Sequence, residues 1–405
     1  MDLHNETLRL LDFALGSVCE EGGFGWLDDT GQIDRTQDRQ LWINCRMTHV
    51  AAIGTLLNHP GCREALDHGV TALTTLFADP IYGGWYDRIS WDGQPIDDTK
   101  AAYAHAFVIL AASSAVAAGS TKALPLFQEA LTISTTRFWD ETQSMSVEEW
   151  DRSFSTLSTY RGVNANMHTV EAYLAAADVI DLVHLSTVSS DLLRVRAHSI
   201  MDRIVNREAR ANQWRIPEHF DEIWTSDLEY NRNQPADPFR PFGATIGHGL
   251  EWARLAIQTH GSITDPPEWM LEGAKALYER AVDDGWEVDG TPGFIYTSDW
   301  DGHPVVHERM HWVLAEAIGA SIALDKARIL ATSQDCGRWW DYADTYLIDY
   351  DNGSWHHELD QNNRPSCLVW TGKPDVYHAL QATLFSRLPV VPAIVPALAR
   401  GLITS

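Results

Sequence analysis

Six apolar, helix-like segments of this sequence each carry a histidine near the middle, and an imidazole can move protons at neutral pH. The six residues are His49, His105, His168, His248, His311 and His378. Burying an unpaired polar group costs about 1–3 kcal/mol, so apolar segments normally exclude such side chains. Their recurrence indicates a repeat whose equivalent helices direct polar groups into one shared cavity.

Two of these histidines stand three residues before a glutamate, a spacing that places both side chains on one helical face. The pairs are His248 with Glu251 and His168 with Glu171, and Arg46 lies in the first of the six segments. Carboxylates can orient hydroxyl groups, an arginine can polarise an oxygen, and histidines can transfer protons. This combination is typical of acid–base chemistry on a sugar.

Other interpretations of the same residues remain open. A single His-x-x-Glu pair is more often a surface ion pair, although Gly, Ile, Leu, Trp and Ala surround His248. His49 and His105 are expected to be hydrogen-bonded core histidines. His and Glu also suit zinc or manganese, but the sequence has neither H-E-x-x-H nor a tight ligand cluster. We therefore predict no metal and no other cofactor.

Amphipathic segments alternate with the histidine-bearing ones and have helical spacing, with charges on one face. They cover residues 6–18, 63–77, 123–138, 192–205, 268–282 and 336–350. The histidine-bearing segments cover residues 42–54, 101–115, 164–177, 243–255, 308–324 and 373–385. The latter are apolar nearly all round, as helices packed on several sides must be. The pattern predicts an outer helix, a loop and an inner helix, six times over.

Short glycine- and aromatic-containing motifs follow each amphipathic segment, at residues 22–26, 83–86, 146–150, 214–218, 293–296 and 353–356. Such motifs predict brief strands or tight turns at the same end of every helical pair. We therefore predict an all-α protein, an (α/α)6 barrel of six helical hairpins in a toroid, with short β segments in the loops at one mouth. Because the repeats would share one core, residues 1–405 are expected to form a single domain. No long parallel-strand pattern supports a Rossmann or TIM fold.

Composition excludes several partners. The formal net charge of −26 disfavours nucleic acid and anionic membranes. Seventeen tryptophans suit the apolar faces of sugar rings, although they also serve as core residues. The five cysteines include no C-x-x-C pair, and neither a signal peptide nor a membrane-spanning run is evident. We expect a cytoplasmic protein with a small-molecule partner.

The motifs RMTHVAAIG, GGWYD, RGVNANMHTVEA, FGATIGHGLEWARL and WTGKPDVYHALQA resemble those of the N-acylglucosamine 2-epimerase superfamily. The resemblance extends from about Trp26 to residues 392–402, near the end of the chain. It implies an (α/α)6 barrel that epimerises sugars at C2 or isomerises aldoses to ketoses by proton transfer between histidines, without metal or nicotinamide. The chain is most similar to the isomerase branch, which contains mannose isomerases and sulfosugar isomerases.

The resemblance also implies roles for matching residues. His248 and His378 match the acid/base pair, with His248 oriented by Glu251, and Arg46 matches the contact to oxygens near the reacting carbons. The residues that match the lining of the sugar pocket, or would pack beside it, are Trp42, Asn164, Met167, His168, Glu251, Trp312, Glu316 and Trp370. We expect His378 to remove the C2 proton, Arg46 to stabilise the oxyanion, and His248 to move a proton between O1 and O2 of a cis-enediol.

Two departures concern the substrate. Pro238 and Pro374 stand where sulfosugar-isomerising relatives carry a basic residue and a glutamine-like residue. Losing a cation and an amide weakens sulfonate binding, which favours an uncharged hexose, although Arg240 and Lys373 remain nearby in sequence. D-mannose to D-fructose is therefore the leading reaction.

The alternatives are a 2-epimerase of the N-acylglucosamine or cellobiose type, a sulfoquinovose isomerase, an inverting glycoside hydrolase and a non-catalytic sugar-binding protein. An inverting hydrolase would need two carboxylates about 6.5–9.5 Å apart across a cleft. Either a monomer or a homodimer is compatible with the sequence.

Overall fold

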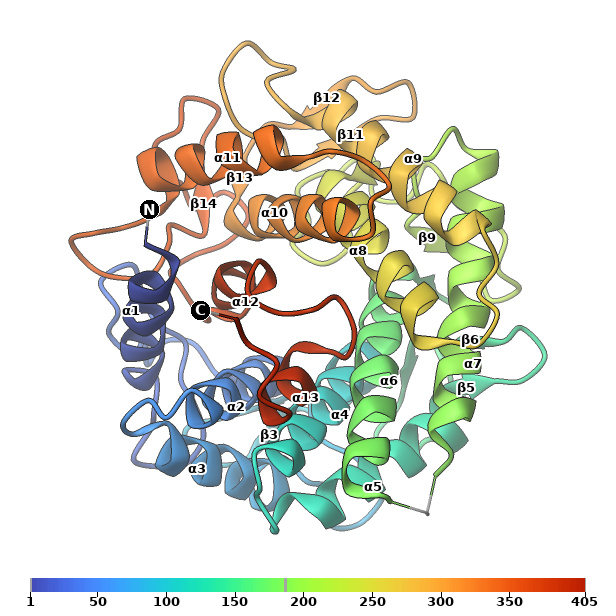
Figure 1. The fold of residues 1–405 in the computed structure, drawn as a ribbon. Coiled ribbons are helices and arrows are strands. Elements are labelled where there is room, and N and C mark those ends of the chain that lie inside the picture. The colour runs from blue at the N-terminus through green and yellow to red at the C-terminus, as the bar shows by residue number, and fades with distance from the viewer. Residues whose placement is uncertain (1, 186–187, 405) are drawn as a thin grey trace.

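Helices dominate the computed structural model, which describes residues 2–185 and 188–404. Six amphipathic helices form an outer ring and six apolar helices form an inner ring (Figure 1). The outer helices are α1 (Leu3–Leu15), α3 (Cys62–Thr75), α5 (Ala123–Ile133), α7 (Ser190–Met201), α9 (Trp269–Gly285) and α11 (Ser333–Tyr342). The inner helices are α2 (Leu41–Leu56), α4 (Ala102–Ala117), α6 (Val163–Val183), α8 (Ile246–Ser262), α10 (His311–Lys326) and α12 (Tyr377–Phe385). The predicted helical class and alternation are confirmed.

Burial follows the sequence pattern of each ring. Helix α4 has an unbroken buried run from Ala104 to Ala115, because neighbouring helices pack on it from several sides. Helix α1 buries one stripe that includes Leu10, Leu11 and Ala14, while its other face carries charge. Small residues on the inner helices allow this close packing around the axis. The polar side chains that the inner helices bury each need a hydrogen-bond partner there.

Three outer helices continue as π-helical turns, which the periodicity of the sequence did not predict. These turns are η1 (Ser134–Phe138), η2 (Asp202–Ala209) and η3 (Ala343–Leu347), and they extend α5, α7 and α11. A π-helical turn inserts an extra residue per turn and so shifts the face that the following residues present. Each one leads directly toward the loops at the mouth of the ring.

Fourteen short strands, as counted over the described residues, pair antiparallel in the loops between outer and inner helices. They are β1 (Arg39–Gln40), β2 (Arg88–Ile89), β3 (Pro95–Asp97), β4 (Lys100–Ala101), β5 (Trp139–Asp140), β6 (Met145–Ser146), β7 (Glu149–Trp150), β8 (Arg161–Gly162), β9 (His219–Phe220), β10 (Ala244–Thr245), β11 (Thr297–Ser298), β12 (Pro304–Val306), β13 (Arg309–Met310) and β14 (Glu358–Leu359). The strand that precedes an inner helix pairs with a strand of the next loop around the ring, as in β1–β2, β4–β7, β8–β9, β10–β11 and β13–β14. These ladders join neighbouring hairpins and hold the N-terminal ends of the inner helices at one mouth.

The ring closes where α12 packs between α10 and α1. The hydroxyls of Thr7 on α1 and Thr383 on α12 are hydrogen-bonded at 2.8 Å, and Trp355 Nε1 donates to Glu6 Oε1 at 2.8 Å. A further helix, α13 (Ile394–Ala399), lies across the opposite end of the inner ring and contacts α2, α4, α6 and α12 (Figure 1). This helix was not among the predicted elements.

None of the helices in residues 2–185 and 188–404 combines the length and apolar character needed to cross a membrane. All five cysteines lie within these ranges and are free thiols, as the absence of a pairing pattern indicated.

Candidate active site

A cavity of about 670 Å³ opens among the first turns of the inner helices. Nine of the predicted site residues line it: Trp42, Arg46, Asn164, His168, His248, Glu251, Trp312, Trp370 and His378. They come from α2, α6, α8, α10, α12 and the loop before α12, so residues far apart in sequence meet at one point. Its wall combines aromatic, titratable and amide side chains, the mixture typical of a small-molecule site.

Two predicted lining residues lie elsewhere. Met167 is buried in the hydrophobic core, because it precedes His168 by one residue and a helix turns about 100° per residue. Glu316 is buried one turn below the cavity and contacts His378 instead of the cavity space. The prediction that Met167 lines the pocket therefore differs from the structure, whereas Glu316 serves the site through a histidine.

His378 is held by Glu316 of α10. The two atoms His378 Nδ1 and Glu316 Oε1 are 2.9 Å apart, so the ring donates its Nδ1–H to the carboxylate and Nε2 is left for the cavity. Burial, reinforced by the positive charge of Arg46, lowers the pKa of His378 well below its usual value. The imidazole is consequently neutral near pH 7, which is the form that can accept a proton.

His248 has a different partner from the one that sequence spacing predicted. Its Nδ1 is 2.9 Å from Oε2 of Glu218, which lies in the loop before β9, whereas Glu251 contacts Arg254 at 3.3 Å. Orientation of His248 by Glu251 is thus wrong. Residues three apart share a helical face, but their side chains need not meet when a loop carboxylate reaches the imidazole first.

Both imidazoles pack against the same indole. The ring centroid of Trp312 is 5.4 Å from that of His248 and 5.8 Å from that of His378. Each histidine is also at least nine-tenths buried, so neither faces bulk solvent. The two histidines therefore contact one tryptophan at the wall of one cavity.

Arg46 is fixed by contacts on several sides. Its Nη1 donates to Asp375 Oδ2 at 3.1 Å and its Nη2 donates to Tyr103 Oη at 3.2 Å. The guanidinium carbon also lies 4.9 Å from the ring centroid of Trp42 and 4.8 Å from that of Tyr377. A cation held in this way can stabilise negative charge on a substrate oxygen without moving.

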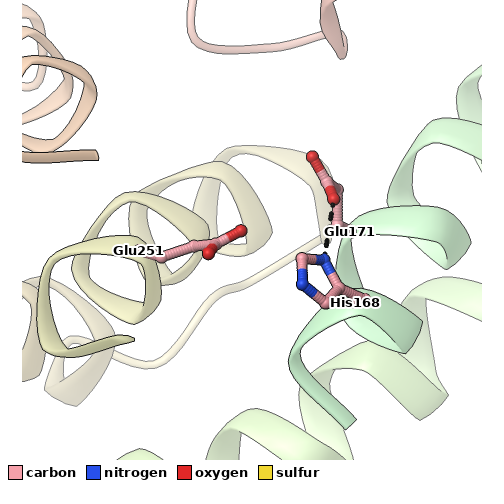
Figure 2. A group of neighbouring side chains, drawn as sticks. All are labelled: His168, Glu171 and Glu251. Atoms are coloured by element: carbon pink, nitrogen blue, oxygen red, sulfur yellow. Dashed lines mark hydrogen bonds and ion pairs between the residues drawn. The ribbon is translucent and has the colours of Figure 1, made fainter. Parts of the chain in front are cut away.

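His168, Glu171 and Glu251 form a tight group that the sequence did not reveal. His168 Nδ1 is 3.3 Å from Glu171 Oε2 on α6, and Glu251 of α8 points toward them (Figure 2). Ligand atoms of all three lie within 4.8 Å of one another, which is close enough to hold a metal ion. However, Tyr377 donates to the second oxygen of Glu171, and Arg254 lies against Glu251. Neighbouring protein groups thus already supply the positive charge and hydrogen bonds that these carboxylates require.

Aromatic rings form the rim of the cavity. The centroids of Trp42 and Trp370 are 6.0 Å apart, and Phe239 lies 5.2 Å from Trp370. Pro238 and Pro374 line the same space and carry no charge. Flat apolar surfaces of this kind pack well against the C–H faces of a sugar.

The two cations that left the substrate question open do not line this cavity. Lys373 is fully buried and its ammonium lies 2.5 Å from Asp349 Oδ2. The guanidinium of Arg240 lies over the ring of Tyr160, 4.1 Å from its centroid. Among the described residues that line the cavity, Arg46 is thus the only lysine or arginine, and Asp375 already balances its charge.

Five lining residues were not singled out from the sequence: Tyr103, Tyr296, His357, Asp375 and Phe239, whereas His311 was one of the six recurring histidines and the two prolines were expected to affect substrate binding. Tyr103 occupies the first turn of α4, as Trp42 does in α2, so its position in the repeat was a usable signal. His357 comes from a loop and had no such signal. Its ring stacks on that of His311 with centroids 3.8 Å apart.

His49 and His105 are core histidines, as expected. His49 Nδ1 lies 2.8 Å from Ser114 Oγ, and His105 Nδ1 lies 2.8 Å from the carbonyl oxygen of Ala101. Burial lowers the pKa of His49 to about 4 and that of His105 to about 3. Neither residue lines the cavity.

The chain is similar in sequence and in structure to known proteins. The family described as N-acylglucosamine 2-epimerase (GlcNAc 2-epimerase) matches residues 22–382. The chain is 44% identical to the D-mannose isomerase of Thermobifida fusca over 98% of this chain and 96% of that protein. It is 41% identical to the D-mannose isomerase of Pseudomonas cannabina pv. alisalensis over 97% and 94%. A crystal structure of D-mannose isomerase, 28% identical, superposes with a TM-score of 0.87 over 95% of this chain and 96% of that one.

Proposed function

This chain belongs to the N-acylglucosamine 2-epimerase family and is an aldose–ketose isomerase, and we propose that its reaction is the reversible conversion of D-mannose to D-fructose. The observation that supports this reaction most directly is the pair His248 and His378, which pack on Trp312 at the wall of one cavity. The relatives named D-mannose isomerase cover nearly the whole chain and favour mannose as the sugar.

Ring opening is the first step, because hexoses rest mainly as closed rings. His248 is suited to assist it: Glu218 holds its Nδ1, so Nε2 can exchange a proton with the ring oxygen or the anomeric hydroxyl. The proton that leaves the anomeric hydroxyl balances the one delivered to the ring oxygen. The product is the open-chain aldose with a free C1 carbonyl.

Proton abstraction from C2 follows. His378 Nε2 accepts the C2 proton, the C2 electron pair forms the C1–C2 double bond, and the carbonyl electrons move to O1. Arg46 lies at the wall where this oxyanion forms and stabilises its charge. His248 then moves a proton from O2 to O1, and His378 returns its proton to C1, which yields the ketose and restores both histidines.

An uncharged sugar fits the lining best. Pro238 and Pro374 offer no charge or hydrogen-bond donor to a sulfonate, and both Arg240 and Lys373 are engaged outside the cavity. Arg46 is paired with Asp375, so a sulfonate would have to displace that carboxylate. Hexose hydroxyls can instead bind Asn164, whose Oδ1 lacks a hydrogen-bond partner, and the oxygens of Glu251.

Epimerisation at C2 is the second candidate, and one observation favours it. His168 is a third imidazole at the cavity wall, on α6, and could deliver a proton to C2 of the same enediol from another direction. Such a step would convert mannose to glucose. Isomerisation returns the proton to C1, whereas epimerisation needs a protonated His168 to deliver a proton to the opposite face of C2, after which His378 loses its proton to solvent and His168 regains one.

An NMR assay tests the proposal. Purified protein is incubated in D₂O with mannose, glucose, cellobiose, N-acetylglucosamine or sulfoquinovose. Fructose from mannose is the expected outcome, and any deuterium at C1 would measure how far the proton held by His378 exchanges with solvent before it is returned. Glucose from mannose would favour the epimerase, turnover of sulfoquinovose alone would contradict the uncharged-sugar assignment, and sugar binding with neither product nor exchange at C2 would contradict catalysis altogether.

We further propose that residues 1–405 act as a single cytoplasmic domain, as a monomer or homodimer, without a metal or other cofactor. The free thiols suit a reducing compartment, and the net charge of −26 disfavours nucleic-acid partners.

A further inference from the structure

Arg254 of α8 has no part in the proposed reaction, yet it is the cation nearest to the carboxylate that holds His378. Its side chain is buried, with 5% of the residue exposed. Its Nε donates to Glu316 Oε2 at 2.8 Å, and its Nη2 donates to Glu251 Oε1 at 3.3 Å. Arg254 therefore joins two neighbouring inner helices beneath the cavity.

Glu316 uses its two oxygens in opposite directions. Oε2 accepts from Arg254, while Oε1 accepts from His378 Nδ1 at 2.9 Å. The three residues form a chain from α8 through α10 to α12 that ends on the candidate base. Arg254 is absent from the wall of the sugar cavity, so it acts on the substrate only through this chain.

The ionisation of Glu316 depends on its surroundings. Burial raises the pKa of Glu316 and the positive charge of Arg254 opposes this rise. The charged or titratable groups around Glu316 and His378 are Arg254 and Glu251 on α8, Glu171 and His168 on α6, Arg46 on α2, His311 on α10, Tyr377 on α12 and Asp375 before α12. Of the two cations in this set, Arg254 alone is bonded to Glu316, so its loss would leave a buried carboxylate without a direct counter-charge.

We propose that Arg254 is a positioning residue that keeps Glu316 ionised and thereby holds His378 in the tautomer with its proton on Nδ1 and its lone pair on Nε2. If Glu316 were protonated, its O–H would donate to Nδ1, and the ring proton would have to lie on Nε2. That tautomer presents N–H to C2 and cannot accept a proton. This inference rests on the proposed function, in which His378 is the base.

The space below Arg254 allows a conservative variant to be tested. A second cavity of about 660 Å³, on the side covered by α13, is lined by Glu171, Arg254, Gln258 and Gln381 among others. An ammonium group placed here would find carbonyl and carboxylate oxygens and room for water. Lysine can therefore carry the charge of Arg254 beside these polar groups, in a cavity whose lining is otherwise mainly apolar.

The decisive comparison is Arg254→Gln against Arg254→Lys. We expect Arg254→Gln to lower kcat for the sugar that the wild type converts by about 100-fold or more, the loss typical of a disabled general base, with little change in KM. The residual kcat should rise with pH as Glu316 ionises, so the acid limb of the pH–rate profile should shift to higher pH than in the wild type. Arg254→Lys should recover most of kcat and the wild-type profile.

A double-mutant cycle tests whether Arg254 acts through Glu316. If it does, Arg254→Gln/Glu316→Gln should be no slower than Glu316→Gln alone, because the second change removes nothing further. Arg215→Gln is the matched control for losing a buried arginine, since Arg215 is 6% exposed, forms a two-bond ion pair with Asp284 and does not line the cavity. It should lower thermal stability without moving the pH profile.

NMR of ¹⁵N-histidine-labelled protein gives a readout independent of turnover. The His378 signals should report a proton on Nδ1 in the wild type and in Arg254→Lys, and on Nε2 in Arg254→Gln. A folded Arg254→Gln protein with an unchanged tautomer, or with wild-type kcat and pH profile, would overturn the inference. A wild type that converts no sugar would contradict the proposed function instead, while the tautomer measurement would still test Arg254.

Discussion

At the scale of single residues, each candidate acid/base histidine depends on a carboxylate from another part of the chain. Glu316 lies 62 positions before His378, and Glu218 lies 30 positions before His248. Motif matches identified the imidazoles, but sequence spacing suggested Glu251 for His248, which is wrong. Pairing of side chains across helices depends on tertiary packing, and local spacing carries no information about it.

The acid limb of the pH–rate profile follows from the environment of His378. Burial and the charge of Arg46 lower the pKa of His378 well below 6.5, and a base works only in its neutral form. Lowering the pH should therefore reduce kcat only as it passes through this depressed pKa, so the acid limb should lie below pH 6.5. Measuring kcat from pH 4 to 8 checks this; a limb centred above pH 6.5 would contradict the assignment.

Metal independence is the second prediction at this scale. The carboxylates of the His168–Glu171–Glu251 group already have Tyr377 and Arg254 as neighbours, so we expect dialysis against EDTA to leave kcat and KM unchanged. Metal analysis of the dialysed protein is the control. Activity lost on dialysis and restored by Zn²⁺ or Mn²⁺ would favour a metal site at this group.

At the scale of elements, the site depends on how the first turns of the inner helices pack together. The alternation of amphipathic and apolar segments predicted both rings of helices, because helical periodicity is a local property. The π-helical turns and α13 could not be predicted in this way, since both depend on contacts with other elements. Met167 lies off the cavity for a related reason, as helical rotation decides which neighbour of His168 faces inward.

Substitution of Gly247 on α8 tests how α8 packs on α10. A Cβ at this position would lie 2.2 Å from Trp312 Cζ3 and 2.8 Å from Val313 Cγ2. Gly247→Ala should therefore displace the indole that both His248 and His378 contact, and we expect kcat to fall at least about tenfold, as small misplacements of catalytic groups do. Steady-state kinetics and tryptophan fluorescence measure the two effects.

Gly249 provides the matched control on the same helix. A Cβ there meets Ala281 Cβ at 3.3 Å and nothing in the cavity. Gly249→Ala should leave kcat within about twofold, and its effect on stability should be small because the gain in helix propensity, about 1 kcal/mol, offsets the tight contact. Equal losses of kcat in the two variants would argue against the proposed role of Trp312 packing.

At the scale of the whole molecule, closure of the ring joins the two ends of the chain. Within residues 2–185 and 188–404, the contacts of α1 with α12 and the strand pairs between successive hairpins connect each hairpin to its neighbours. The repeat alone predicted that six hairpins form a closed ring around a shared core. The individual contacts that close the ring, such as the hydrogen bond between Thr7 and Thr383, were not predictable from the sequence.

One-domain behaviour is the prediction at this scale. If residues 1–405 share one core, urea should unfold the protein in a single transition, with tryptophan fluorescence and far-UV circular dichroism giving the same midpoint. Thr383→Val, which removes the hydroxyl pair between α12 and α1, should lower the free energy of unfolding by about 1 kcal/mol. Two separated transitions would show that the chain contains independent folding units.

The most direct test of histidine-mediated proton transfer uses D-mannose labelled with deuterium at C2, with wild type and His378→Asn compared by NMR. Asparagine fits the cavity and keeps a polar group there, so the variant should remain folded by circular dichroism. The account predicts that wild type removes the C2 deuterium and forms fructose, and that His378→Asn does neither at a detectable rate. Loss of the C2 deuterium at the wild-type rate in a folded His378→Asn protein would contradict it.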